Sequence, residues 1–160
     1  MKKLISLFTF STLAFVAFGQ TPRIIVQGTG APQVFMDFAL AIAAANATNV
    51  LYMSGGDFSL GNGTVYIDHE VHIVGAGFHP DSAAHTLPTR LIDGTVRFHL
   101  PASNCSVTGV HFSVTMNYGD AASENQGCTG MLFARCYMDG GFSMDANAGS
   151  STTFDQCFLL

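Results

Sequence analysis

Charged residues are scarce in this 160-residue chain, and lysine is almost absent from it. Six lysines and arginines stand against eleven aspartates and glutamates, and charged residues make up only 11% of the sequence, where about a quarter is typical. After Lys2 and Lys3 the chain has no further lysine. A protein that neutralises the phosphates of a nucleic acid needs a cluster of basic side chains. The sequence therefore excludes a nucleic-acid binder and, on the same ground, a protein held on an anionic membrane surface.

The sequence also lacks a run of apolar residues long enough to cross a bilayer, which takes about 20 residues. The longest such run, residues 4–18, follows two lysines and is interrupted only by serine and threonine. Ala17 and Gly19 are the small residues expected three and one positions before a secretory cleavage site. The pattern predicts a signal peptide over residues 1–19, a secreted or cell-surface protein, and no membrane span once the leader is removed.

One segment of the remaining chain has the period of a helix. Phe35, Phe38 and Ile42 recur at intervals of three and four residues, which places them on one helical face. We expect a helix over about residues 32–46, after an opening strand and turn over residues 20–30. Because its other faces are mostly alanine, such a helix should be covered on several sides.

Residues 47–160 instead show short runs with a period of two, separated by Gly, Asn-Gly and Ser/Thr turns, and no second helical pattern. This favours strands and argues against a doubly wound α/β sheet, which needs crossover helices. One six-residue pattern recurs as "IVGAGF" (73–78), "VTGVHF" (107–112), "LFARCY" (132–137) and "TFDQCF" (153–158). If successive turns of the chain stack, the sixth position of each copy forms one internal aromatic column. Its members are Phe78, Phe112, Tyr137 and Phe158.

The stretch "FMDFALAIAAANATNVLYMSGGDFSL" (35–60), followed by "HIVGAGF" and "VTGVHF", resembles secreted proteins of the right-handed parallel β-helix, pectate-lyase-like group, of a Bacteroidetes type. In that group a short Ala-rich helix covers the N-terminal end of the coils. The resemblance and the repeat together predict an all-β fold: a right-handed parallel β-helix (β-solenoid) over residues 31–160 with a short N-terminal capping α-helix. Because "TTFDQCFLL" stops within an apolar strand, we expect missing C-terminal coils or a partner strand.

The resemblance also implies candidate chemistry. Lyases of this group hold Ca²⁺ with several acidic side chains and use a basic residue as the catalytic base. Arg90 and Asp93, in "TRLIDG", are weaker candidates for base and Ca²⁺ ligand, because an arginine beside an acidic residue is more often a surface ion pair. No acidic cluster of the kind those enzymes carry is visible, and no cofactor is evident unless Ca²⁺ serves a lyase.

Two further polar stretches are candidate binding sites. In "DHEVH", Asp68, Glu70 and His72 alternate along a strand and share one face, which suits a sugar or metal site or a solvated strand face. In "DGGFSMDAN", Asp139, Asp145 and Asn147 offer oxygen ligands for a metal ion, and a Gly-rich turn is the alternative interpretation.

Two of the four cysteines, Cys136 and Cys157, occupy the same position of successive repeats. Neighbouring strands lie about 4.8 Å apart, within the Cα separation of about 4.4–6.8 Å that a disulfide needs. Two stacked thiols fit the same geometry, so both alternatives stay open.

These observations predict a secreted or cell-surface protein of structural, adhesive or glycan-binding type with no evident catalytic site, whose partner is a polysaccharide or cell-surface glycan. The alternative is a polysaccharide lyase or glycoside hydrolase of the pectate-lyase-like group acting on an acidic polysaccharide. An immunoglobulin-like sandwich adhesin is a third and more distant alternative.

Overall fold

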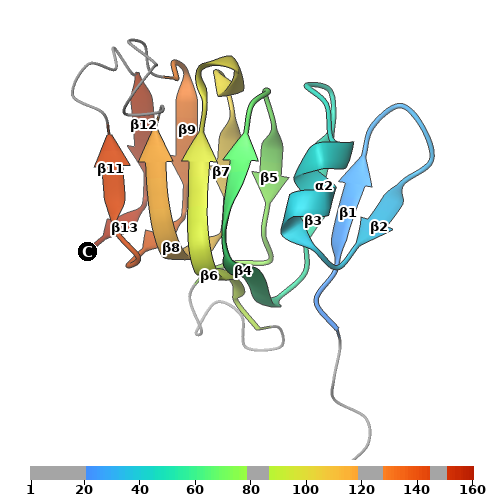
Figure 1. Cartoon of the computed structure of the whole chain (residues 1–160), viewed down its shortest axis with the longest axis horizontal. Coiled ribbons are helices and arrows are strands. Elements are labelled where there is room, and N and C mark those ends of the chain that lie inside the picture. The colour runs from blue at the N-terminus through green and yellow to red at the C-terminus, as the bar shows by residue number, and fades with distance from the viewer. Residues whose placement is uncertain (1–20, 79–86, 119–127, 145–150) are drawn as a thin grey trace, which may run out of the picture.

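The computed structural model describes residues 21–78, 87–118, 128–144 and 151–160. The predicted signal peptide, residues 1–19, lies outside these residues. Two sheets face each other, and their strands run side by side along the length of the molecule (Figure 1). The seven-stranded sheet has the order β12 (Thr152–Asp155), β9 (Met131–Ala134), β7 (Ser106–Thr108), β5 (His72–Val74), β3 (Val50–Met53), β1 (Ile24–Gln27) and β2 (Gln33–Phe35). The six-stranded sheet has the order β13 (Phe158–Leu159), β10 (Tyr137–Met138), β8 (His111–Tyr118), β6 (Thr89–Phe98) and β4 (Gly56–Ile67), with β11 (Phe142–Met144) also paired to β8.

From β3 onward the chain passes back and forth between the two sheets. Each passage adds a strand parallel to the one before it in the same sheet, as in the pairs β5–β7 and β6–β8. The N-terminal end differs, because β1 pairs antiparallel with both β2 and β3. The short connection over residues 28–32 reverses the chain directly, which only an antiparallel pair allows.

The predicted fold class, an all-β right-handed parallel β-helix (β-solenoid), is therefore wrong. The structure has two separate and mostly parallel sheets together with an α-helix, a mixed arrangement of the α/β type. Within the ranges that the structure describes, the strands do not form a closed solenoid. The antiparallel strands at the N-terminal end add an element that a parallel coil does not contain.

The predicted helix over residues 32–46 is shorter than expected. Gln33–Phe35 forms strand β2, and α2 spans only Phe38–Ala44. Asp37 is the N-cap of α2, and its carboxylate accepts a hydrogen bond from the backbone N–H of Leu40 at 2.9 Å, which satisfies an otherwise unpaired donor of the first turn. The first part of the predicted segment is therefore a strand because it pairs with β1, and the N-cap residue determines where the helix begins.

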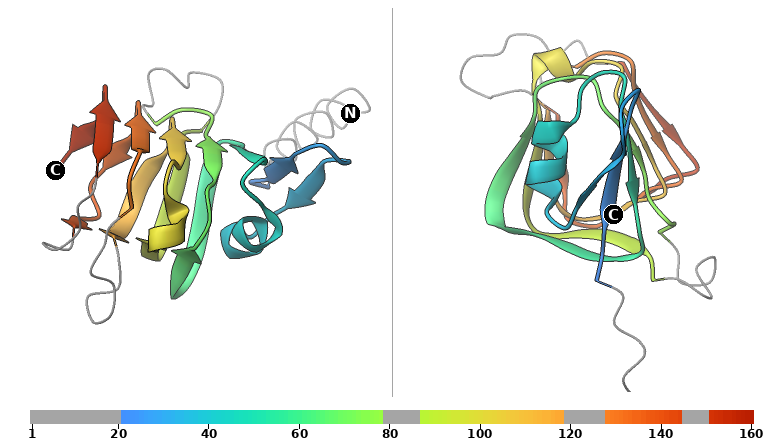
Figure 2. Two further views of the ribbon diagram at one scale, coloured as in Figure 1. Left: turned by 90° about the horizontal axis from the view of Figure 1, so that it is seen from above. Right: turned by 90° about the vertical axis from the view of Figure 1, so that its right-hand side faces the viewer.

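Helix α2 lies across the N-terminal end of the space between the two sheets (Figure 2). Phe38, Ala41 and Ile42 are its buried residues and belong to the common hydrophobic core. The opposite side of the helix is open, with Leu40 61% exposed. The helix therefore closes one end of the core on a single face, whereas its composition predicts cover on several sides.

The strand pairing shifts the third and fourth copies of the six-residue repeat by one residue relative to the first two. Ile73 pairs with Val107 as the alignment predicts, but Val107 pairs with Phe133 rather than Leu132, and Phe133 pairs with Phe154. These four residues form the inner column of the seven-stranded sheet, and the Phe133 and Phe154 rings stack with centroids 5.5 Å apart.

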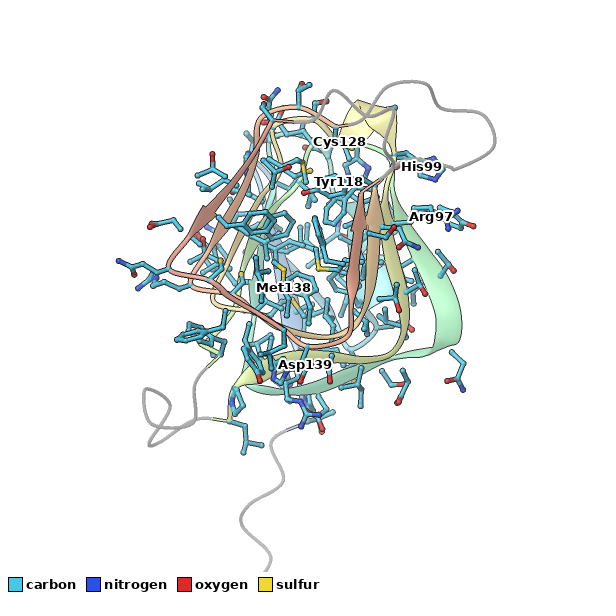
Figure 3. The ribbon with its side chains drawn as sticks, turned by 90° about the vertical axis from the view of Figure 1, so that its left-hand side faces the viewer. Arg97, His99, Tyr118, Cys128, Met138 and Asp139 are labelled. Atoms are coloured by element: carbon cyan, nitrogen blue, oxygen red, sulfur yellow. The ribbon has the colours of Figure 1, made fainter. Side chains whose placement is uncertain are left out.

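The predicted internal aromatic column is consequently wrong. Phe112 is buried and pairs with Met138, whereas Tyr137 pairs with His111 and Phe158. Phe158 is 59% exposed, so this ring lies on the outside of the six-stranded sheet. Figure 3 shows the interior filled by side chains from both sheets, with Met138 among them and Asp139 outside.

Candidate functional site

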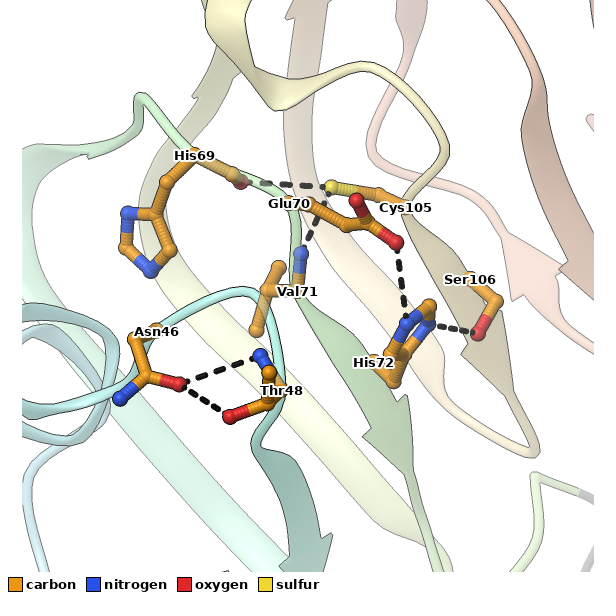
Figure 4. A network of polar contacts seen from close by, with 8 residues as sticks. All are labelled: Asn46, Thr48, His69, Glu70, Val71, His72, Cys105 and Ser106. Atoms are coloured by element: carbon orange, nitrogen blue, oxygen red, sulfur yellow. Dashed lines mark hydrogen bonds and ion pairs between the residues drawn. The ribbon is translucent and has the colours of Figure 1, made fainter. Parts of the chain in front are cut away.

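The structure brings together two of the three residues predicted for the site in "DHEVH". Nε2 of His72 lies 3.3 Å from Oε1 of Glu70, and its Nδ1 is hydrogen-bonded to Oγ of Ser106 at 2.8 Å (Figure 4). Asp68 instead pairs with its neighbour His69 at 2.9 Å, and this hydrogen bond holds the pKa of Asp68 below its usual value. Because both ring nitrogens of His72 have partners, the cluster links β5 to β7 and leaves no open ligand position on that ring.

Arg90 and Asp93 do not form the predicted pair. Nε of Arg90 lies 3.7 Å from Oδ1 of Asp57 on the neighbouring strand β4, while Oδ2 of Asp93 accepts a hydrogen bond from Oγ of Ser59 at 3.1 Å. Each residue therefore interacts with β4 separately, and the structure does not join them as base and Ca²⁺ ligand.

Only one residue of the predicted oxygen cluster can be placed. Asp139 accepts a hydrogen bond from Nε2 of His111 at 3.0 Å, whereas Asp145 and Asn147 lie outside the described residues. Burial alone would raise the pKa of Asp139, but hydrogen bonds from His111 and Ser113 together with the charge of His111 bring it below its usual value. Across the described ranges, no three His, Cys, Asp or Glu side chains are grouped so as to hold a metal ion.

Cys136 and Cys157 lie next to each other and are both free thiols. The backbone N–H of Cys136 points at Sγ of Cys157, 3.4 Å away. Cys136 is fully buried, and burial raises the pKa of its thiol to about 12. In this state the two residues pack as small apolar side chains, and the alternative of a disulfide stays a prediction.

A groove that the sequence did not predict runs along one edge of the seven-stranded sheet. Since β5, β7, β9 and β12 are parallel, their carboxyl ends meet at this edge, where parallel sheets commonly bind ligands. The groove has a volume of about 770 Å³, within the range of about 300–1,000 Å³ found for small-molecule sites. It is lined by residues 74–78, Thr108, Gly109, Arg135, Gln156 and Phe158; we call it the corner groove.

The floor of the corner groove is formed by the residues that directly follow the four strands. They are Gly75, Gly109, Arg135 and Gln156. A Cβ on Gly75 would lie 2.4 Å from the carbonyl oxygen of Gly109, so the two backbones approach too closely for any other residue at Gly75. Thr89, fully buried, supports the adjoining wall: its Oγ1 accepts a hydrogen bond from the N–H of Ala76 at 2.8 Å.

Arg135 and Gln156 occupy floor positions whose backbone favours glycine. Gly109 has a φ of 69°, and Arg135 and Gln156 have φ values of 51° and 53°. A side chain in this left-handed region costs about 1–2 kcal/mol, and residues held in such conformations concentrate at functional sites. Two large polar side chains are thus present where glycine would be more stable.

Two aromatic rings form a wall of the corner groove. The centroids of the Phe78 and Phe158 rings are 6.1 Å apart, although 80 residues separate them in the sequence: Phe78 lies after β5, whereas Phe158 is the first residue of β13. The site therefore combines an apolar wall with the polar side chains of Arg135 and Gln156 on the floor and of Thr108 at the end of β7.

On the outer surface of the six-stranded sheet, a row of paired residues begins at Phe158. We call it the outer row. Tyr137 is in register with both Phe158 and His111, and the register continues through Arg90 to Asp57. The ring of Tyr137 lies 4.6 Å from that of His111 and 6.4 Å from that of Phe158, measured between centroids. The corner groove and the outer row thus share Phe158.

Comparison with protein-family models, curated proteins and solved structures finds no match to this chain. The resemblance to the pectate-lyase-like group therefore stays a prediction. In the described part of the chain, no helix is both long and apolar enough to span a membrane.

Proposed function

We propose that this protein binds glycans and that the corner groove is the binding site. A pyranose ring has apolar C–H faces that pack on aromatic rings and a rim of hydroxyl groups that needs hydrogen-bond partners. Phe78 and Phe158 offer the first kind of contact. Arg135, Gln156 and Thr108 carry donors and acceptors for the second.

The observation that carries the proposal is the left-handed backbone at Arg135 and Gln156. Packing does not require a large side chain at these positions, since both residues are exposed and glycine at the equivalent position of β7 is compatible with the same turn. Their side chains therefore have a use that offsets the conformational cost. Hydrogen bonding to a ligand in the groove that they line is such a use.

Binding rather than catalysis is the function that the corner groove supports. Among the described residues that line the groove, Arg135 is the sole ionisable side chain, so these residues include no pair of groups to donate and accept a proton as glycoside hydrolysis or elimination requires. The enzymatic alternative, a lyase or hydrolase for acidic polysaccharides, stays a prediction from the resemblance alone.

Isothermal titration calorimetry of the purified chain with cellohexaose, xylohexaose and polygalacturonate tests the proposal. We expect at least one of these glycans to bind, and Phe158→Ala to weaken that binding at least tenfold. Tyr52→Ala is the matched control, because Tyr52 is a ring of similar exposure, 44%, on the outer face of the seven-stranded sheet. Absence of binding to all three glycans, or an equal loss in both variants, would contradict the proposal.

The same material tests the lyase form of the enzymatic alternative. Incubation with polygalacturonate and Ca²⁺ produces unsaturated, ultraviolet-absorbing ends only if the chain is a lyase. We expect no such absorbance under conditions in which binding is measurable.

A further inference from the structure

The outer row lies on the solvent side of the six-stranded sheet. In β4, β6, β8 and β10 the row residue directly precedes a buried residue: Phe58, Leu91 and Phe112 are at most 3% exposed, as is Met138. Because neighbouring residues of a strand point to opposite faces, the row itself faces outward. Its members, in strand order, are Asp57, Arg90, His111, Tyr137 and Phe158.

We propose that the outer row extends the corner groove and that the ligand is a linear, uncharged glycan lying across the strands. This inference depends on the proposed function, because it starts from Phe158, which belongs to both surfaces. A chain bound there would run perpendicular to β10, β8 and β6. The binding surface would then continue from the groove over several neighbouring strands.

The spacing of the row suits a chain of sugars. Adjacent strands are about 4.8 Å apart, which is close to the length that one pyranose unit adds to an extended glycan. Successive sugars can therefore meet the side chains of successive strands. The three strands nearest the groove contribute Phe158, Tyr137 and His111. The ring of Tyr137 contacts the rings of both neighbours.

The charges of the row favour an uncharged ligand. Arg90 has Asp57 as its neighbour at 3.7 Å, and His111 has Asp139 at 3.0 Å. Each basic group is thus matched with an acidic one, so the row has no excess positive charge for carboxylates or sulfates. The chain as a whole has a net charge of −5, which repels polyanions at low ionic strength.

The contact between His111 and Asp139 also fixes part of the surface before a ligand arrives. The side chain of His111 is only 13% exposed, and Asp139 accepts the hydrogen bond of its Nε2. The imidazole therefore supports the ring of Tyr137 from one side with little freedom to rotate. Such preorganisation reduces the entropy lost on binding.

Ligand length is the variable that tests this inference. We expect Tyr137→Ala to weaken cellohexaose binding about tenfold and to leave cellobiose binding unchanged, because a disaccharide fits within the corner groove. Phe158→Ala should weaken both. Tyr66→Ala is the matched control: Tyr66 is 51% exposed on β4 but lies outside the row, so its loss should change neither affinity.

Each result has a distinct meaning. If Tyr137→Ala binds cellohexaose as the wild type does, the row is not part of the site, while the proposed function survives. If polygalacturonate binds more tightly than the neutral hexasaccharides, the assignment of an uncharged ligand is wrong. If the wild type binds no glycan at all, the proposed function itself fails.

Discussion

The inward-facing column of the seven-stranded sheet and the outward-facing row of the six-stranded sheet differ in amino-acid composition. The inner column of the seven-stranded sheet contains only apolar residues: Ile73, Val107, Phe133 and Phe154. The outer row of the six-stranded sheet changes in character along its length, from acidic Asp57 through basic Arg90 to the rings of the last three strands. Burial accounts for the apolar residues of the inner column, of which Ile73, Val107 and Phe133 are buried and Phe154 is half-buried. It does not explain the outer row, whose composition we attribute to ligand binding.

The largest expected difference between the two faces is in stability. Phe133 is fully buried, stacks on Phe154 and contacts the rings of Phe98 and Phe112. Phe133→Ala should lower the free energy of unfolding by about 3–5 kcal/mol, whereas Tyr137→Ala on the outer face should cost less than about 1 kcal/mol. Urea unfolding followed by circular dichroism measures both. Similar losses for the two variants would show that the outer row is also a packing surface.

A smaller effect of opposite sign is expected at the floor of the corner groove. Arg135→Gly removes a side chain from a left-handed residue, so it should raise the free energy of unfolding by up to about 1 kcal/mol while weakening glycan binding. Arg23→Gly is the control, because Arg23 is exposed and has no positive φ. Glycine there should give no gain in stability. A destabilised Arg135→Gly variant would mean that the arginine serves packing rather than recognition.

The smallest effect concerns pH and the pair of His111 and Asp139. The pKa of Asp139 is below the ordinary value of 3.8, so its carboxylate adds stability that is present above that value and lost as the pH falls through the lowered pKa. Melting temperatures measured from about pH 5 to about pH 3 should therefore fall more steeply for the wild type than for Asp139→Asn. Parallel curves would show that the hydrogen bond from His111 contributes nothing measurable to stability.

Part of the fold could be read from the sequence. The period of two predicted strands after residue 46, and "IVGAGF" and "VTGVHF" align as the pairing of Ile73 with Val107 shows. The third copy is displaced because Leu132 and Phe133 are both large and apolar, and a one-residue shift reverses which of them faces inward. Only contact with the strands on either side decides that Phe133 is buried and Leu132 is 39% exposed.

The N-terminal end shows why local periodicity misleads. The intervals between Phe35, Phe38 and Ile42 suit a helix, but Gln33–Phe35 pairs with β1, a tertiary interaction that no local pattern reveals. The signal for the true start was present in Asp37, a preferred N-cap residue directly before the helix. The prediction of purely parallel coils failed at this end because no local pattern shows that the chain reverses between β1 and β2.

The displacement of the repeat also hid the candidate site. Aligned by the observed pairing, the last two copies read "FARCYM" (133–138) and "FDQCFL" (154–159). Arg135 and Gln156 then fall at the third position, where the first two copies have Gly75 and Gly109. With the correct register the sequence would have indicated two polar residues at glycine positions. The contact between Phe78 and Phe158 has no such signal, because it depends on how the chain is folded over several strands.

The passage of the chain between two sheets also determines how the molecule must fold. Partners in adjacent strands are distant in sequence: 34 residues separate His72 from Ser106, and 21 separate Cys136 from Cys157. Each parallel pair therefore closes a long loop before it gains any contact, and proteins with many such pairings reach the native state slowly. During that interval, unpaired strand edges are exposed to other chains. Dilute refolding should accordingly give a higher yield of soluble protein than concentrated refolding.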